Sequence, residues 1–175
     1  MCRGHYRVCE PKGLTRSRYF RKVNPCIPIV DEVLFRRQYQ INKDRISPAL
    51  IAALLAHTLV HWNFSKTLSN HRHPDSRLIW NLANEAVYSE LRLSPGMSII
   101  KAILLDVGGL PTTSPIANGM LLGSAVSMAH SLGLNNDPLP WEISHLEKCL
   151  RMKIWWTLLV HDRWYVPRDV DRDQF

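Results

Sequence analysis

The sequence contains no C-x-x-C pair, although it has four cysteines, Cys2, Cys9, Cys26 and Cys149. A binuclear zinc cluster needs six thiolates, and paired cysteines supply adjacent corners of each tetrahedral site. The gap between Cys2 and Cys9 also occurs inside such clusters, but two cysteines cannot hold two zinc ions. The sequence therefore predicts no structural zinc site and no other cofactor in this chain, and its free thiols suit a reducing compartment.

Long apolar runs are also absent. The longest, Ala49 to Ala56, is far shorter than the roughly 18 residues that a membrane span needs. The first 25 residues hold no apolar block of the signal-peptide type. Hydrophobic residues make up 46% of the chain and charged residues 21%, so a buried core is expected. These features predict a soluble intracellular chain with no membrane partner.

Acidic residues are scarce at the beginning of the chain. Residues 1–22 carry seven basic side chains against Glu10 alone, a net charge of +6 out of +7 for the whole sequence. A basic surface spread over the whole fold would indicate phosphate binding. A basic end on a nearly neutral body is more typical of a solvated tail. Non-specific contact with nucleic acid through this end is the alternative interpretation.

Helix signals divide the rest of the chain. We expect an irregular basic end over residues 1–13, a helical domain over residues 14–165 and a charged tail over residues 166–175. The expected helices span 14–23, 32–39, 49–62, 76–93, 97–107, 115–132 and 145–165. No run alternates with the period of a strand. The predicted fold class is all-α, a multi-helix bundle of antiparallel helix pairs that forms part of a domain.

Capping residues mark the ends of these helices. Asp31 and either Asp75 or Ser76 suit N-caps, and Ser47-Pro48 and Ser114-Pro115 combine a capping hydroxyl with proline at the first helical position. Ser144 and Glu147 have the spacing of a capping box. Gly133 stands where a left-handed residue ends a helix, with Leu134 as the apolar contact behind it.

Three segments carry predictions about packing. Residues 25–30 hold two prolines among apolar residues, which predicts an extended segment across the core. Gly119, Gly123 and Ser127 form a small-residue stripe, which predicts close approach of a second helix. The run Ile154 to Val160 is apolar on nearly every side, so its tryptophan pair is predicted to be core rather than a stacking platform for bases.

Candidate catalytic residues are few. His57 and His61 have the i, i+4 spacing of a zinc-protease helix, but Thr58 stands where the glutamate general base would be. No third ligand can be assigned. The G-x-S-x-G nucleophile elbow and the Gly-Lys-Ser/Thr ending of a phosphate loop are both missing. The sequence predicts no enzyme, and a metal-dependent enzyme using His57 and His61 is kept as an alternative.

The order of the segments is itself informative. Tyr19-Phe20 precedes the run from Asn24 to Asp31, and Phe35 to Tyr39 follows it. This order resembles the opening of the fungal-specific transcription factor domain, the middle homology or regulatory region of fungal zinc-cluster transcription factors. That family typically begins with an aromatic pair, a His/Asn-Pro-x-x-Pro-Ile core and a phenylalanine-containing helix.

Two later runs are also similar to motifs of this family. Gly123 to Leu134 resembles its G-x-A-x-x-x-A-x-x-L-G-L helix. Glu147 to Trp156 resembles its signature helix, in which a glutamate and basic residues precede a tryptophan pair, and Asp162-Arg163 resembles the D-R/K that follows. The family-motif positions with an expected structural role are Pro25, Pro28, Gly123, Ala125, Ala129, Gly133, Leu134, Arg151, Trp155, Trp156 and Asp162.

The resemblance covers roughly residues 17–165. It implies a nuclear chain that modulates DNA-templated transcription, with a small-molecule effector or a protein co-regulator as partner. It also implies that DNA and zinc are bound only by an upstream zinc cluster of full-length relatives. Asn135-Asn136 replaces the usual His-Arg, and Val166-Pro167-Arg168 replaces the usual Gly-Arg-Pro turn. We therefore expect a domain that is cut short at both ends.

Overall fold

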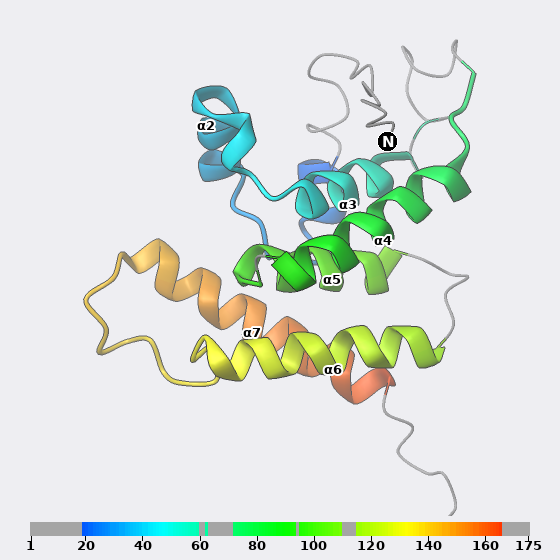
Figure 1. The fold of residues 1–175 in the computed structure, drawn as a ribbon. Coiled ribbons are helices and arrows are strands. Elements are labelled where there is room, and N and C mark those ends of the chain that lie inside the picture. The colour runs from blue at the N-terminus through cyan, green and yellow to red at the C-terminus, as the bar shows by residue number, and fades with distance from the viewer. Residues whose placement is uncertain (1–18, 60–61, 63–71, 94, 110–114, 166–175) are drawn as a thin grey trace, which may run out of the picture.

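The computed structural model describes residues 19–59, 62, 72–93, 95–109 and 115–165 of the chain (Figure 1). These residues form helices, and no strand occurs among them, which confirms the predicted all-α class. The elements are η1 (Tyr19–Val23), α2 (Glu32–Ile41), η2 (Lys43–Arg45), α3 (Pro48–Leu59), α4 (Ser76–Leu93), α5 (Met97–Gly109), α6 (Pro115–Ser131) and α7 (His145–Tyr165).

The predicted helix boundaries are close to the observed ones. Helix α5 includes Gly108 and Gly109, so its predicted end at residue 107 is two residues early. Helix α3 is described to Leu59, and its predicted continuation falls partly on residues outside the described ranges. The predicted irregular end at 1–13, the first residues of the 14–23 helix, the cap Ser114 and the tail at 166–175 also lie outside those ranges.

Side-chain oxygens cap the helix N-termini as the sequence predicts. Each accepts a hydrogen bond from a backbone N–H in the first turn, which satisfies a donor that has no partner within the helix. The pairs are Asp31 with Leu34 at 2.8 Å, Ser47 with Leu50 at 3.1 Å, Asp75 with Arg77 at 2.9 Å and Ser144 with Glu147 at 3.2 Å.

Helix α5 lies at the centre of the bundle. Its residues Ile99, Ile100 and Ala102–Val107 are buried, and it contacts α3, α4, α6 and α7. A helix that is apolar on all sides is stable in water only when other helices surround it. Figure 1 shows α3 and α4 packed on one side of α5 and the α6–α7 hairpin on the other. The core therefore lies along both sides of α5.

The segment of residues 24–30 packs against this core as predicted. Ile29 and Val30 are buried, whereas Pro25 and Pro28 are exposed. A turn precedes them, in which the backbone N–H of Cys26 donates to the carbonyl of Val23 at 2.9 Å. The prolines restrict the backbone to an extended path, and the two aliphatic side chains anchor that path to the bundle.

The prediction that the whole tryptophan segment is core is wrong. Ile154 and Leu158 of α7 are fully buried, but Trp156 is 65% exposed and Trp155 is only half-buried. Side chains four residues apart share a helix face, whereas residues two apart point roughly 160° away from each other. Trp156 lies on the side of α7 away from Ile154 and Leu158 and is left exposed there, so the apolar run is not buried all round.

The prediction of close approach along the small-residue stripe is also wrong. Gly119 and Gly123 lie on the exposed side of α6, and no described atom lies within 4 Å of the place where a Cβ would stand. The buried contacts of α6 are made by other residues, including Ala125 and Ala129. The stripe has the same helical period as the buried face but points in the opposite direction.

Candidate functional site

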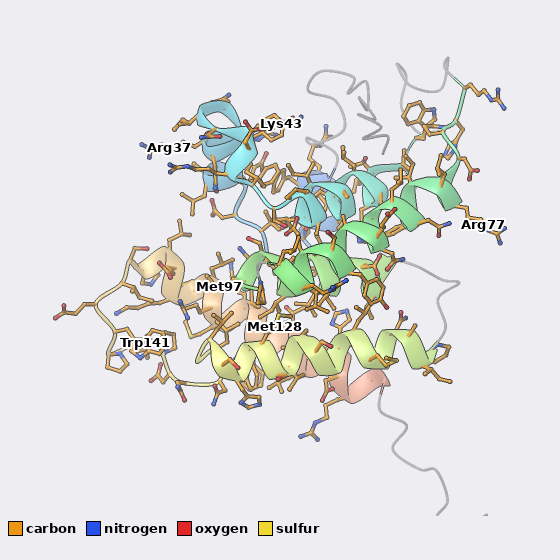
Figure 2. All side chains as sticks on the ribbon, in the orientation of Figure 1. Arg37, Lys43, Arg77, Met97, Met128 and Trp141 are labelled. Atoms are coloured by element: carbon orange, nitrogen blue, oxygen red, sulfur yellow. The ribbon has the colours of Figure 1, made fainter. Side chains whose placement is uncertain are left out.

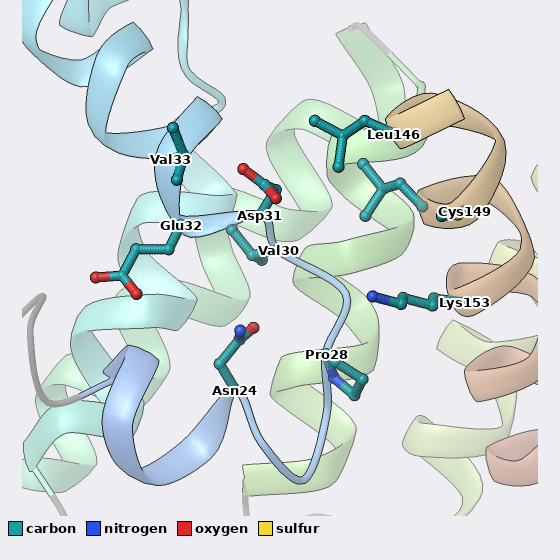
Figure 3. Close-up of a pocket in the computed structure, with 10 residues that line it drawn as sticks. Asn24, Pro28, Val30, Asp31, Glu32, Val33, Leu146, Cys149 and Lys153 are labelled. Carbon is teal, nitrogen blue, oxygen red and sulfur yellow. The ribbon is translucent and has the colours of Figure 1, made fainter. Parts of the chain in front are cut away.

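A cavity of about 250 Å³ lies between the 24–33 segment and the first half of α7 (Figure 3). It joins the two stretches of sequence that resemble family motifs, the proline segment and the signature helix. Figure 3 shows the side chain of Lys153 extending from α7 into the gap, with the amide of Asn24 pointing into it from another side. The lining residues are Asn24, Pro28, Val30, Asp31, Glu32, Val33, Leu146, Cys149, Leu150 and Lys153.

The amide oxygen of Asn24 is a buried acceptor beside this cavity. Its Oδ1 atom is buried and has no hydrogen-bond partner among the described residues. A buried acceptor without a donor costs about 1–3 kcal/mol in folding stability, so such atoms are rare without a reason.

Charges of both signs surround the cavity. One carboxylate oxygen of Asp31 accepts the capping hydrogen bond from the backbone N–H of Leu34 in α2. Glu32 forms an ion pair with Arg36 at 2.7 Å. Burial lowers the pKa of Lys101 on α5, and the nearby carboxylates of Asp31 and Glu147 oppose that shift. The ammonium of Lys153 has no ion-pair partner within the described ranges. The cavity thus offers a cation to a small polar molecule.

His57 makes contacts of the kind that hold a buried side chain in place. Its Nε2 atom lies 2.6 Å from the carbonyl oxygen of Leu105, and a carbonyl can only accept, so this nitrogen carries the proton. The ring also packs edge-on against Trp80 at a centroid distance of 5.3 Å. His61 lies outside the described residues. Within the described ranges no three His, Cys, Asp or Glu side chains gather in a metal-binding group.

The turn between α6 and α7 is held by the predicted glycine. Gly133 has a φ of 67°, in the left-handed region that favours glycine. The backbone N–H of Leu134 donates to Ala129 and that of Gly133 donates to His130, at 2.9 and 3.0 Å. These two bonds form a Schellman motif, with Leu134 buried behind it. The predicted roles of Gly133 and Leu134 are confirmed.

Arg151 connects this turn to α7. Its Nη1 donates to the carbonyl of Leu132 at 3.3 Å, and its Nε pairs with Glu147 at 3.3 Å. The guanidinium lies over the indole ring of Trp141, 5.0 Å from the ring centroid. Figure 2 shows Trp141 in the loop that joins α6 to α7. One side chain therefore ties together the end of α6, the connecting loop and the first turns of α7.

The other family-motif positions lie in different parts of the structure. Pro28 lines the cavity, and Ala125 and Ala129 are core residues of α6. Trp155 touches His130 of α6 at a ring-centroid distance of 5.4 Å. Asp162 is half-buried on α7, while Pro25, Gly123 and Trp156 are exposed. The structure does not bring these positions together into one site.

Sequence reasoning missed several residues that the structure singles out. Glu90 of α4 accepts hydrogen bonds from the first turn of α3, and Trp141 stacks on Arg151. A long-range contact of this kind leaves no local spacing signal. Asp106 could have been noticed in the sequence, because it is the single acidic residue in the mostly apolar run from Ile99 to Val107.

Asp106 is fully buried, and neither carboxylate oxygen has a hydrogen-bond partner among the described residues. Burial raises its pKa to about 6. Burial likewise raises the pKa of the Tyr19 phenol. Both groups lie in the core and outside the lining of the cavity. We therefore expect them to affect the folding stability of the domain rather than ligand binding in the cavity.

The fold and its cavity define an all-α domain in which packed helix pairs and a central helix support a small polar pocket. The model of the fungal specific transcription factor domain matches residues 17–166, and the chain belongs to that family. None of the helices within the described ranges is long and apolar enough to cross a bilayer.

Three curated proteins illustrate the similarity. An uncharacterized transcriptional regulatory protein of Schizosaccharomyces pombe is 28% identical over 147 residues, 84% of this chain and 22% of that protein. The transcriptional activator protein DAL81 of Saccharomyces cerevisiae is 29% identical over 148 residues, 83% of this chain and 15% of that protein. Cutinase transcription factor 1 alpha of Fusarium vanettenii is 26% identical over 148 residues, 83% of this chain and 16% of that protein.

The chain thus spans between 15% and 22% of the length of these relatives. No solved structure gives a significant match. The family and the names of the relatives support a role in transcription regulation and, indirectly, a role that is not enzymatic.

Proposed function

We propose that this chain is the regulatory domain of a fungal zinc-cluster-type transcription factor and acts in the nucleus. In this proposal it modulates transcription without binding DNA in a sequence-selective way itself. The family match over residues 17–166 carries the proposal. Two further facts support it: the lack of paired cysteines, and a net charge that is concentrated in residues 1–22.

The cavity suggests how such a domain would respond to an effector. Its walls come from the proline segment and from α7, two parts that are more than a hundred residues apart in sequence. A small molecule that presents an acceptor or an anion to Lys153 and packs against Asn24 and Pro28 would hold the two walls together. Because a ligand stabilises the conformation that it binds best, it would shift the domain toward that conformation.

A mobility-shift assay at physiological salt tests the first part of the proposal. We expect the chain alone to bind DNA weakly and without sequence preference. Any weak binding should vanish with added salt and with removal of residues 1–22, because it would come from counterion release at the basic end. Tight, sequence-selective binding by the chain would contradict the proposal.

A reporter assay tests the regulatory role. The chain is fused to an unrelated DNA-binding domain, and reporter output is compared for the original chain, Asn24→Ala and Lys153→Ala. Arg77→Ala, an exposed position on α4, is the matched control. We expect the two cavity variants to change reporter output and the control to leave it unchanged. Equal output from all four fusions, at equal protein level, would rule out a regulatory role for the cavity.

A further inference from the structure

Helix α2 buries one side against the bundle and leaves another side open. Phe35 is its buried residue, and its ring centroid lies 5.8 Å from that of Phe20 and 6.1 Å from that of Tyr39. Leu34 and Ile41 lie on a different side of the helix, because residues three, four or seven positions apart share a face. They are 45% and 73% exposed. The contacts of Phe35 therefore fix which side of α2 faces solvent.

An open pocket of about 610 Å³ lies on this exposed side of the helix. We call it the α2 pocket. Its lining comes from α2, from the residue after it and from η2, and consists of Leu34, Arg37, Gln38, Ile41, Asn42 and Arg45. Among the described residues it shares no lining with the cavity between residues 24–33 and α7. The α2 pocket is therefore a separate site.

The α2 pocket contains two cations without partners. Arg37 and Arg45 are exposed, and their guanidinium groups form no hydrogen bond, ion pair or ring contact within the described ranges. Figure 2 shows Arg37 extending from α2 away from the bundle. The other cations nearby are engaged, because Arg36 forms an ion pair at 2.7 Å within α2 and the ammonium of Lys43 lies 5.3 Å from an aromatic ring centroid. No described Asp or Glu lines the pocket, so its positive charge is uncompensated.

We propose that the α2 pocket binds a small organic phosphate monoester whose organic part is apolar. The planar guanidinium groups of Arg37 and Arg45 donate paired hydrogen bonds to the phosphate oxygens, a geometry that arginine offers and lysine does not. Asn42 Oδ1 already accepts from a backbone N–H two residues later at 3.1 Å, so the NH₂ group of Asn42 is the part that donates to the ligand. The organic part packs against Leu34 and Ile41 and leaves water.

Size and charge distinguish this ligand from others. The pocket volume falls within the range of roughly 300–1,000 Å³ that is typical of small-molecule sites. A phosphate monoester carries a charge of about −1.5 to −2 near pH 7, which matches two arginines better than the single charge of a carboxylate does. Leu34 and Ile41 beside the cations do not suit a nucleic-acid backbone, which is charged along its whole length. The proposal does not depend on the cavity or on a role in transcription.

Calorimetric titration of the full 175-residue chain tests the proposal with four probes. Hexyl phosphate carries both chemical features, inorganic phosphate lacks the apolar part, hexanoate has a single charge, and hexylamine has the opposite charge. We expect hexyl phosphate to bind at least about tenfold more tightly than inorganic phosphate and about threefold more tightly than hexanoate. Its affinity should fall as salt is raised, and hexylamine should not bind.

Variants locate the site. Arg37→Ala and Arg45→Ala should each weaken hexyl phosphate by at least about tenfold, whereas Arg77→Ala, an exposed position on α4, should leave its affinity unchanged. Lys153→Ala removes the cation of the cavity and should also have no effect. Ile41→Ser should weaken hexyl phosphate but not inorganic phosphate. Circular dichroism melts check that each variant is folded, and because the replaced side chains are exposed we expect an unchanged helical signal.

Four outcomes would overturn the proposal. Affinity that survives substitution of both pocket arginines would place the ligand elsewhere, for example at the basic residues 1–22. Loss of binding in Lys153→Ala would assign the ligand to the cavity. Equal affinity for hexyl phosphate and inorganic phosphate would show a purely ionic contact without a role for Leu34 and Ile41. Tighter binding of hexanoate, or no binding of hexyl phosphate, would exclude a phosphate monoester as the ligand.

Discussion

The carboxylate of Glu90 accepts a hydrogen bond from the hydroxyl of Ser47 at 2.7 Å, although 43 residues separate the two. Its other oxygen accepts from the backbone N–H of Ala49, also at 2.7 Å. The end of α4 thus satisfies the start of α3, which already has Ser47 as its own cap. The negative charge also lies at the positive end of the α3 dipole, where it is favourable.

Replacement of Glu90 should therefore destabilise the fold. We expect Glu90→Ala to lower the free energy of unfolding by about 1–3 kcal/mol, because a partly buried N–H and a hydroxyl lose a charged acceptor. Urea denaturation should show a lower midpoint with an unchanged slope. Glu85→Ala, an exposed position on the same helix, is the control and should stay within about 0.5 kcal/mol of the original chain. Equal effects of both substitutions would show that the cap contributes nothing.

Asp106 should make stability depend on pH. Its pKa of about 6 in the folded chain lies above the ordinary value of 3.8. The folded state therefore holds a proton that the unfolded state has already lost, and stability falls as pH rises from about 4 to about 6. Above that range the loss is about 3 kcal/mol, an upper estimate that takes the full shift.

Asp106→Asn removes the charge at nearly constant shape. The variant should be more stable than the original chain at pH 7.5 and nearly equal to it at pH 4, as measured by urea midpoints across this range. Glu85→Gln is the matched control and should run parallel to the original chain at every pH. A constant difference between Asp106→Asn and the original chain would mean that the carboxylate does not titrate in this window.

Two glycines provide opposite tests of packing. A Cβ at Gly109 would lie 2.5 Å from Cη2 of Trp80 and 2.6 Å from Cε1 of His57, whereas a Cβ at Gly123 would meet no described atom. Gly109→Ala should destabilise the fold by about 1–3 kcal/mol through overpacking. Gly123→Ala should stabilise it by about 0.5–1 kcal/mol, because alanine is the better residue within an exposed helix. Thermal melts of the two variants measure these changes. A loss of stability in Gly123→Ala as well as in Gly109→Ala would mean that another helix does approach the small-residue stripe of α6, as the sequence predicted.

The contacts of Arg151 with Leu132, Glu147 and Trp141 should stabilise the packing of α6 against α7. We expect Arg151→Lys to recover little of the stability lost in Arg151→Ala, because a lysine cannot stack on Trp141 while reaching Leu132 and Glu147. The expected loss in either variant is about 1–2 kcal/mol. Arg163→Ala, an exposed arginine on the same helix, is the control. A double-mutant cycle with Trp141→Ala should give a coupling energy clearly above zero, and additive losses would show that the stacking is incidental.

The sequence predicted the helices because their signals are local. Asp31, Ser47, Asp75 and Ser144 cap helices through bonds to residues two or three positions away. Gly133 ends α6 through its own backbone conformation. Such contacts depend on spacing along the chain, and spacing is visible in a sequence.

The packing could be predicted only in part, because it depends on which helix lies where. The apolar run around Trp156 and the glycines of α6 have a clear period, but a period does not tell which face has a neighbour. The cap from Glu90, the stacking of Trp141 and the cavity beside Asn24 each join distant segments. None of them has a local signal, so the candidate site became visible only in three dimensions.

The enclosure of α5 by four other helices has a kinetic consequence. We expect the backbone amides of its buried stretch, residues 102–107, to reach solvent only when the bundle opens, so that their hydrogen exchange reports the global free energy of unfolding. Amides on the exposed faces of α2 and α7 can exchange through local fraying. A ligand or partner that binds the folded chain would therefore slow exchange in α5 even when it touches only the periphery, and the size of that slowing would measure its affinity.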